Sequence, residues 1–307
     1  LVGSEMCIRD STICGAHLQK LDSTYFLVFG HRFDGRYDRD DNTGFHVQEY
    51  SYAIRKFKIA DDGTNLSITD FESITDTAEF RRRDYNLVPQ IFPDGEKGLT
   101  AFSGVFLANA DLPYLNSVNI TSSGHEIDND FDQLLSQYHN AVMPVYDSLA
   151  NQMHTFFFGG MAMYTVDSIT GNMVADTLIP FVNTISKVTR FADSSMQEFA
   201  LNLRMPGLLG TNAQFILKPG IKNFGDHIID VNDISGRVHV GWIFGGITSP
   251  VPNISDSDAS VSDASDWIFE VYIDENLVGQ NDPILFPEQM IDISIHPNPT
   301  AGATRIC

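Results

Sequence analysis

The sequence predicts an all-β fold in which small sheets repeat around an axis, as in a β-propeller. Three observations support this prediction: short runs rich in Phe, Tyr, Trp and Val recur along the chain, several of them end in glycine, and other runs alternate apolar with charged residues. Continuous apolar runs are typical of strands buried on both faces, whereas alternation is typical of a strand with one solvated face. A β-sandwich or jelly roll, which also uses many short strands, is the alternative.

Four glycine-ended runs mark the expected units, at residues 25–30, 99–104, 155–160 and 240–246. Glycine at the end of a strand permits a turn with positive φ or a close approach of two backbones. A later run alternates better, as in residues 267–274. Each unit should therefore contain inner buried strands, a glycine turn and a more exposed outer strand, which makes four visible blades.

The two middle units repeat most closely, because Pro89 precedes Gly104 by the same number of residues as Pro144 precedes Gly159. Apolar runs stand before both prolines. The long gaps between units are expected to hold inserted loops, at residues 34–49, 122–137, 193–225 and 250–265. Residues 131–138 carry a short helix-like spacing, which loop residues that pack inward would also produce.

An aromatic-rich strand followed by a diglycine, as at residues 155–160 and 240–246, resembles the kelch repeat, which is about 50 residues long. The units here are longer and divergent. The resemblance implies a kelch-like β-propeller over residues 12–285, with a blade number that stays open at four or more.

The chain has 307 residues, of which 43% are hydrophobic, and its formal net charge is -21. So negative a surface repels phosphate backbones and anionic membranes, which argues against a nucleic-acid partner, and no run is apolar enough for a transmembrane segment. The cysteines are Cys7, Cys14 and Cys307, so the core has neither a disulfide framework nor a cysteine zinc site. Residues 1–11 resemble a non-genomic leader read through on metagenomic contigs, and we expect them to be non-native.

The segment 286–307 forms a short C-terminal β tag. Ile291, Ile293 and Ile295 alternate as in a strand, and a proline-rich turn follows. This segment resembles the truncated start of the type A C-terminal sorting domain of the type IX secretion system, although His296 stands where that family has Tyr. The motif residues are Pro297, Asn298, Pro299 and Thr300. An ordinary proline-rich turn is the alternative.

The sorting-domain resemblance implies the type IX secretion machinery as a partner, a Gram-negative bacterium of the Bacteroidota, and a secreted or outer-membrane surface location. Residues 82–90 and 205–210 are similar to stretches of uncharacterised secreted proteins of that group. That second likeness concerns location and architecture only, and it implies no activity.

The densest basic cluster, residues 81–83, enters the strand expected to be innermost in its unit. Innermost strands line the channel of a propeller, where these side chains could bind an anion or a sugar carboxylate. An Arg-Asp network that ties neighbouring blades together is the alternative. The candidate binding residues are Arg82, Arg83, Asp84, Tyr85, His139 and Asn140.

A weak calcium motif lies at residues 38–44, where Asp38, Asp40 and Asn42 offer oxygen ligands at alternate positions. Its glycine is one place late and no Glu stands at the twelfth position, so a solvated acidic loop is favoured over Ca²⁺ as a cofactor. Nucleophile-elbow, zinc-protease, P-loop and dinucleotide signatures are absent from the sequence. We expect a binding or scaffolding module, with a carbohydrate-active hydrolase or lyase and a purely structural adhesion component as alternatives.

Overall fold

The computed structural model describes residues 13–35, 46–167, 171–254, 261–274 and 291–297. Within these ranges the protein is all-β: its regular elements are strands and one short 3₁₀ turn, η1 (Val231–Asp233). The all-β prediction is confirmed. The described strands do not form a closed ring of sheets, so the kelch-like propeller stays an interpretation of the sequence.

Four antiparallel sheets follow one another along the chain, and each contains four strands in chain order. Sheet 1 is β1 (His17–Leu21), β2 (Thr24–Val28), β5 (Ala53–Asp61) and β6 (Leu66–Thr75). Sheet 2 is β7 (Asn86–Ile91), β8 (Lys97–Phe102), β9 (Ser117–Ile120) and β10 (His125–Asp128). Sheet 3 is β11 (Ala141–Asp147), β12 (Gln152–Met161), β15 (Phe181–Arg190) and β16 (Met196–Arg204), and the short β19 (Ile229–Asp230) pairs in parallel with β11. Sheet 4 is β18 (Gln214–Leu217), β20 (Arg237–Phe244), β23 (Trp267–Asp274) and β24 (Ile291–Pro297).

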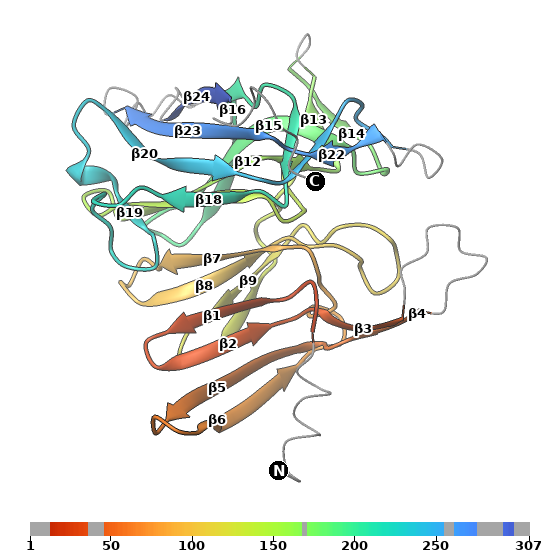
Figure 1. Cartoon of the computed structure of the whole chain (residues 1–307), viewed down its shortest axis with the longest axis vertical. Coiled ribbons are helices and arrows are strands. Elements are labelled where there is room, and N and C mark those ends of the chain that lie inside the picture. The colour runs from red at the N-terminus through yellow and green to blue at the C-terminus, as the bar shows by residue number, and fades with distance from the viewer. Residues whose placement is uncertain (1–12, 36–45, 168–170, 255–260, 275–290, 298–307) are drawn as a thin grey trace.

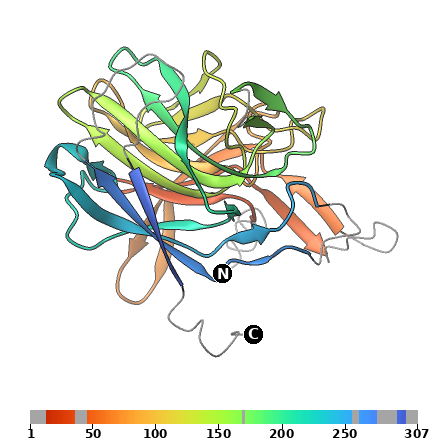
Figure 2. The same ribbon diagram turned by 90° about the horizontal axis from the view of Figure 1, so that it is seen from above.

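In three of the units, the chain forms additional strands between the second and third strands of the sheet, and these strands belong to separate small sheets. They are β3 (His31–Gly35) with β4 (His46–Tyr50), β13 (Tyr164–Val166) with β14 (Met173–Ala175), and β21 (Ile247–Ser249) with β22 (Asp263–Ala264), where β21 also pairs with β17 (Leu208–Thr211). Figure 1 shows sheet 1 at one end of the long axis, and the β3–β4 hairpin projects sideways from the stack in Figure 1 and Figure 2.

The four glycine-ended runs occupy equivalent strands. Gly30, Gly104 and Gly245 follow β2, β8 and β20, and Gly159 lies near the end of β12, so each glycine belongs to the second strand of its sheet. All four have a positive φ. A Cβ on Gly159 would lie 2.1 Å from the carbonyl oxygen of Leu209. The glycine is therefore required there by the close approach of β17 as well as by the backbone conformation.

Successive sheets pack face to face through separate apolar clusters. Phe26, Val28 and Leu99 belong to the cluster between sheets 1 and 2. Phe102 and Phe157 join sheets 2 and 3, with ring centroids 5.3 Å apart. A large cluster joins sheets 3 and 4. Because each fully buried Phe contributes about 1.5–3 kcal/mol, these interfaces hold neighbouring sheets in fixed positions.

All four expected inserted loops contain strand residues. Residues 122–137 include β10, the outer strand of sheet 2, residues 34–49 include part of β4, and residues 250–265 include β22. Residues 193–225 are not an inserted loop, because they contain β16, β17 and β18, and so supply the outer strand of sheet 3 and the first strand of sheet 4. Residues 131–138 form no helix; Phe131 and Leu135 are buried from a loop, which is the alternative given above. Short, half-buried segments carry only weak periodicity in the sequence, which is why these elements were hard to predict.

The C-terminal strand expected at Ile291–Ile295 is present as β24, which pairs with β23 and completes sheet 4. Asn298, Pro299 and Thr300 lie outside the described residues, as do residues 1–11. Among the residues that the structure describes, no helix has the length and apolar character needed to cross a membrane.

Candidate functional site

Polar residues gather where the first strands of the four sheets begin. Asp84, His139 and Asn212 each stand two residues before such a strand, namely β7, β11 and β18, and His17 is the first residue of β1. The backbone N–H of His139 donates to the carbonyl oxygen of Asp84 at 2.6 Å, and that of Asn212 donates to the carbonyl oxygen of His139 at 2.8 Å. The residue two places before the first strand is thus hydrogen-bonded through its backbone from sheet 2 to sheet 3, and from sheet 3 to sheet 4.

Side chains complete this site. We call the group of His17, Asp84, Tyr85, His139, Asn140, Asn212 and Gln214 the polar junction. The ring nitrogens of His139 lie 3.3 Å from Asn212 Oδ1 and 3.2 Å from Gln214 Nε2. Asn212 and Gln214 are exposed, whereas Asn140 and Tyr85 are buried, so the junction opens to solvent on the side of sheet 4.

His17 connects sheet 1 to the junction. Its Nε2 lies 2.8 Å from the carbonyl oxygen of Tyr85, and its backbone N–H donates to the Tyr85 hydroxyl at 3.2 Å. The Tyr85 hydroxyl in turn donates to the carbonyl oxygen of Val28. Tyr85 is therefore a structural link between sheets 1 and 2, and burial raises its pKa so that the hydroxyl stays protonated.

Burial governs the charges at the junction. It lowers the pKa of His17 to about 4, with a smaller contribution from His139, and it also lowers the pKa of His139. Burial raises the pKa of Asp84, against the opposing effects of Arg83 and His139. Both imidazoles are consequently neutral at pH 7, and each can donate one hydrogen bond and accept another.

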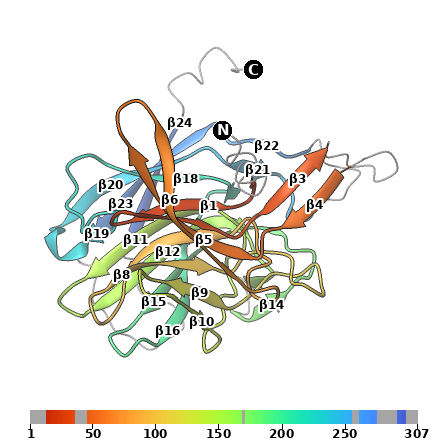
Figure 3. The same ribbon diagram turned by 90° about the horizontal axis from the view of Figure 1, so that it is seen from below.

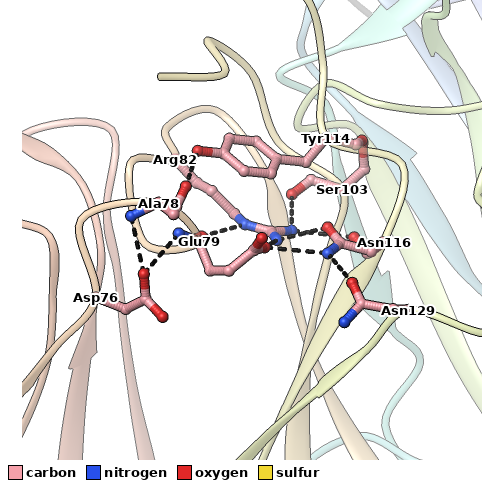
Figure 4. A network of polar contacts seen from close by, with 8 residues as sticks. All are labelled: Asp76, Ala78, Glu79, Arg82, Ser103, Tyr114, Asn116 and Asn129. Carbon is pink, nitrogen blue, oxygen red and sulfur yellow. Dashed lines mark hydrogen bonds and ion pairs between the residues drawn. The ribbon is translucent and has the colours of Figure 1, made fainter. Parts of the chain in front are cut away.

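Arg82 does not face a ligand. It is fully buried, and its five N–H groups are taken up by Glu79, Ser103 and Asn116 (Figure 4). Its guanidinium also lies over the ring of Tyr114 at 4.0 Å. Burial lowers its pKa to about 10, which still leaves it charged at pH 7. The alternative given from the sequence is an Arg-Asp network between neighbouring blades, whereas Arg82 pairs with Glu79 and connects sheet 2 to the loop that precedes it.

The other two arginines of the basic cluster also have protein partners. Arg81 donates to the carbonyl oxygens of Phe106 and Leu107. Arg83 lies 3.4 Å from the carboxylate of Asp84, and it stacks over the ring of Phe106 at 4.3 Å. All three arginines therefore have protein partners, and the exposed groups of the junction, Asn212 and Gln214, are neutral amides.

Asn140 is a structural member of the junction. Its side chain accepts from Asn86 Nδ2 and donates to the carbonyl oxygen of Gly159 at 2.8 Å, and its backbone N–H donates to Asn86 Oδ1. Asp84-Tyr85 and His139-Asn140 occupy equivalent places, immediately before β7 and β11. Sequence reasoning missed Asn212 and Gln214 because their segment was interpreted as a loop.

The weak calcium motif, Asp38, Asp40 and Asn42, lies outside the described residues. Elsewhere in the ranges that the structure covers, no three His, Cys, Asp or Glu residues are grouped so that they could hold a metal ion. Fold and site together define an all-β protein of consecutive four-stranded sheets with a polar junction at the starts of their first strands. No protein-family model matches the chain, and no curated protein matches its sequence.

Proposed function

We propose that this chain is a binding or scaffolding module whose four sheets act as consecutive blades of a kelch-like propeller. Three regularities support this proposal: every sheet has its strands in chain order, three sheets carry additional strands after the second strand, and neighbouring sheets pack through apolar clusters. The observation that carries the functional part is the polar junction, because side chains from all four sheets meet there beside solvent.

The ligand that suits the junction is a polar part of an extracellular glycan or protein. Neutral imidazole and amide groups offer both donors and acceptors, and the charge of Arg83 is offset by Asp84. Hydrogen bonds to exposed amides are also compatible with a wet interface, in which water bridges part of the contact.

A glycan array made of neutral and uronate-containing oligosaccharides from plant and marine polysaccharides tests this proposal, followed by calorimetry on each glycan that binds. We expect His139→Gln and Gln214→Ala to weaken binding about tenfold or more, equal to about 1.4 kcal/mol. Glu72→Gln, on the exposed strand β6, is the matched control and should change nothing. Unchanged affinity in both junction variants and in Arg83→Ala would show that the junction is not the binding site.

We also propose that the protein is exported by type IX secretion machinery to the outside of a Gram-negative bacterium. The support is the proline-rich motif that begins at Pro297, the last residue of β24. In a host with this machinery, Asn298→Ala combined with Pro299→Ala should leave the full-length protein inside the cell if the motif is a sorting signal. Export at the normal level would favour an ordinary turn.

The alternative function is a carbohydrate-active hydrolase or lyase. Carboxylates line a groove between sheets 2 and 3, which gives this reading a specific place in the molecule. Release of new reducing ends from any polysaccharide in the panel, lost when groove carboxylates are changed, would favour the enzyme over the binding module.

A further inference from the structure

A groove of about 1080 Å³ lies between the outer parts of sheets 2 and 3. It is lined by β9, β10 and the segment after β10 on one side, and by the end of β15 with the following turn on the other. Figure 3 shows β9 and β10 along the same side of the molecule as β15 and β16. The groove shares no residue with the polar junction.

Arg190, the last residue of β15, lies in this groove and is only 4% exposed. Its Nη2 donates to Asn119 Oδ1 at 2.8 Å and to Thr100 Oγ1 at 3.3 Å, and its guanidinium lies over the ring of Phe92 at 5.0 Å. Its Nε is buried and finds no acceptor among the described residues. A buried N–H without a partner costs about 1–3 kcal/mol, so the protein satisfies the hydrogen-bonding groups of this arginine incompletely.

The charge of Arg190 persists at pH 7. Burial lowers its pKa to about 10, while Asp128 and Glu126 act in the opposite direction. A charged donor is therefore fixed at the inner wall of the groove. A water molecule or a ligand hydroxyl could accept from it.

The rim of the groove is acidic. Its carboxylates are Asp94, Glu96, Glu126, Asp128, Asp130 and Asp193. Against one arginine, six carboxylates repel an anionic ligand. They do not form a metal site, because no three of the described acidic, histidine or cysteine residues are grouped so that they could hold an ion. Two phenyl rings, Phe92 and Phe131, also line the groove.

We propose that this groove binds an uncharged, polyhydroxylated ligand, namely a stretch of neutral glycan. A sugar hydroxyl both donates and accepts, so it matches a fixed donor on the wall and acceptors on the rim at the same time. A cation would use only the rim, and an anion only Arg190. The partly exposed ring of Phe92 suits the apolar face of a sugar ring. Ligand pockets are usually about 300–1,000 Å³, so this volume suits an oligosaccharide rather than a single sugar.

Calorimetry with neutral oligosaccharides tests the proposal on the whole chain, using laminarihexaose, cellohexaose, xylohexaose and mannohexaose at millimolar concentration. We expect saturable binding of at least one of them. Glu126→Gln combined with Asp128→Asn should weaken it about tenfold or more, and Arg190→Met should weaken it further. The double variant keeps the side-chain shapes, including the Asp128 oxygen that accepts from the Asp130 N–H, so it protects the test against misfolding of the Arg190 variant.

One control variant separates this site from the rest of the molecule. Glu72→Gln on sheet 1 should leave the affinity unchanged, because Glu72 lies outside the groove. The proposal is overturned if none of the four oligosaccharides binds, or if the double variant binds as tightly as the original protein. It is also overturned if calcium chloride alone gives saturable heat that the double variant abolishes, which would identify a cation site.

Discussion

His17 and His139 lie against each other at the polar junction, with ring centroids 5.1 Å apart, although they belong to the first and third sheets. Each imidazole contacts groups from a further sheet: His17 bonds to Tyr85 of sheet 2, and His139 contacts Gln214 of sheet 4. Two neutral rings can lie this close at little electrostatic cost, whereas two charged imidazolium rings would repel each other.

Acidification should therefore loosen the junction. The unfolded chain protonates His17 near its usual pKa of 6.5, but the folded protein does so only near 4, so the free energy of unfolding falls as the pH drops from 6.5 to 4. His17→Gln should remove this part of the pH dependence. Urea denaturation across that pH range measures it, with His125→Gln on the exposed strand β10 as control. Equal slopes for His17→Gln and the original protein would contradict the expectation.

Glu198 should give a pH dependence of the opposite sign. Burial raises its pKa to about 7, even though the backbone N–H groups of Leu134 and Leu135 donate to its carboxylate. Because the unfolded chain ionises this group near pH 4.5, stability should fall as the pH rises from 4.5 to 7.

The free energy of unfolding of Glu198→Gln should increasingly exceed that of the original protein as the pH rises from 4.5 to 7. Above pH 7 this difference in free energy should be constant. Thermal unfolding at a series of pH values checks this. The exposed Glu72→Gln should show no such trend, and a Glu198→Gln variant that tracks the original protein at every pH would refute the assignment.

Arg82→Met should cost about 3–5 kcal/mol of unfolding free energy. The change leaves the Glu79 carboxylate without its ion pair at 2.9 Å, and it leaves the carbonyl oxygens of Ser103 and Asn116 without a donor. Arg32→Met is the matched control, because Arg32 makes its ion pairs at the surface and should matter by less than about 1 kcal/mol. Denaturant unfolding of both variants distinguishes a structural arginine from a surface one.

Gly159→Ala should destabilise the protein by more than about 3 kcal/mol, because the new Cβ would meet the carbonyl oxygen of Leu209 in a backbone conformation with positive φ. Gly245 holds the corresponding place in sheet 4, but a Cβ there meets nothing within 4 Å. Gly245→Ala should therefore cost only the backbone strain, about 1–2 kcal/mol. Similar losses in the two variants would show that the approach of β17 is unimportant.

Much of the fold could be predicted from the sequence because the second strands of sheets 2 and 3 are buried on both faces and carry continuous apolar runs, such as residues 155–160. First and outer strands were harder to find. β18 has only four residues of mixed character, and β16 mixes buried with exposed positions, so both fell inside a predicted loop. With β18 missed, Asn212 and Gln214 could not be aligned with His139.

The sequence by itself determined the all-β class and the four repeated units, because these depend on local periodicity and spacing. Only the tertiary structure decided what the side chains do. Arg82 and Arg83 are adjacent in the chain, yet one is fully enclosed by sheet 2 and its preceding loop while the other lies beside Asp84. Likewise, Arg190 and the carboxylates of β10 line the same groove only because sheets 2 and 3 pack together, and such proximity of distant segments leaves no pattern in the sequence.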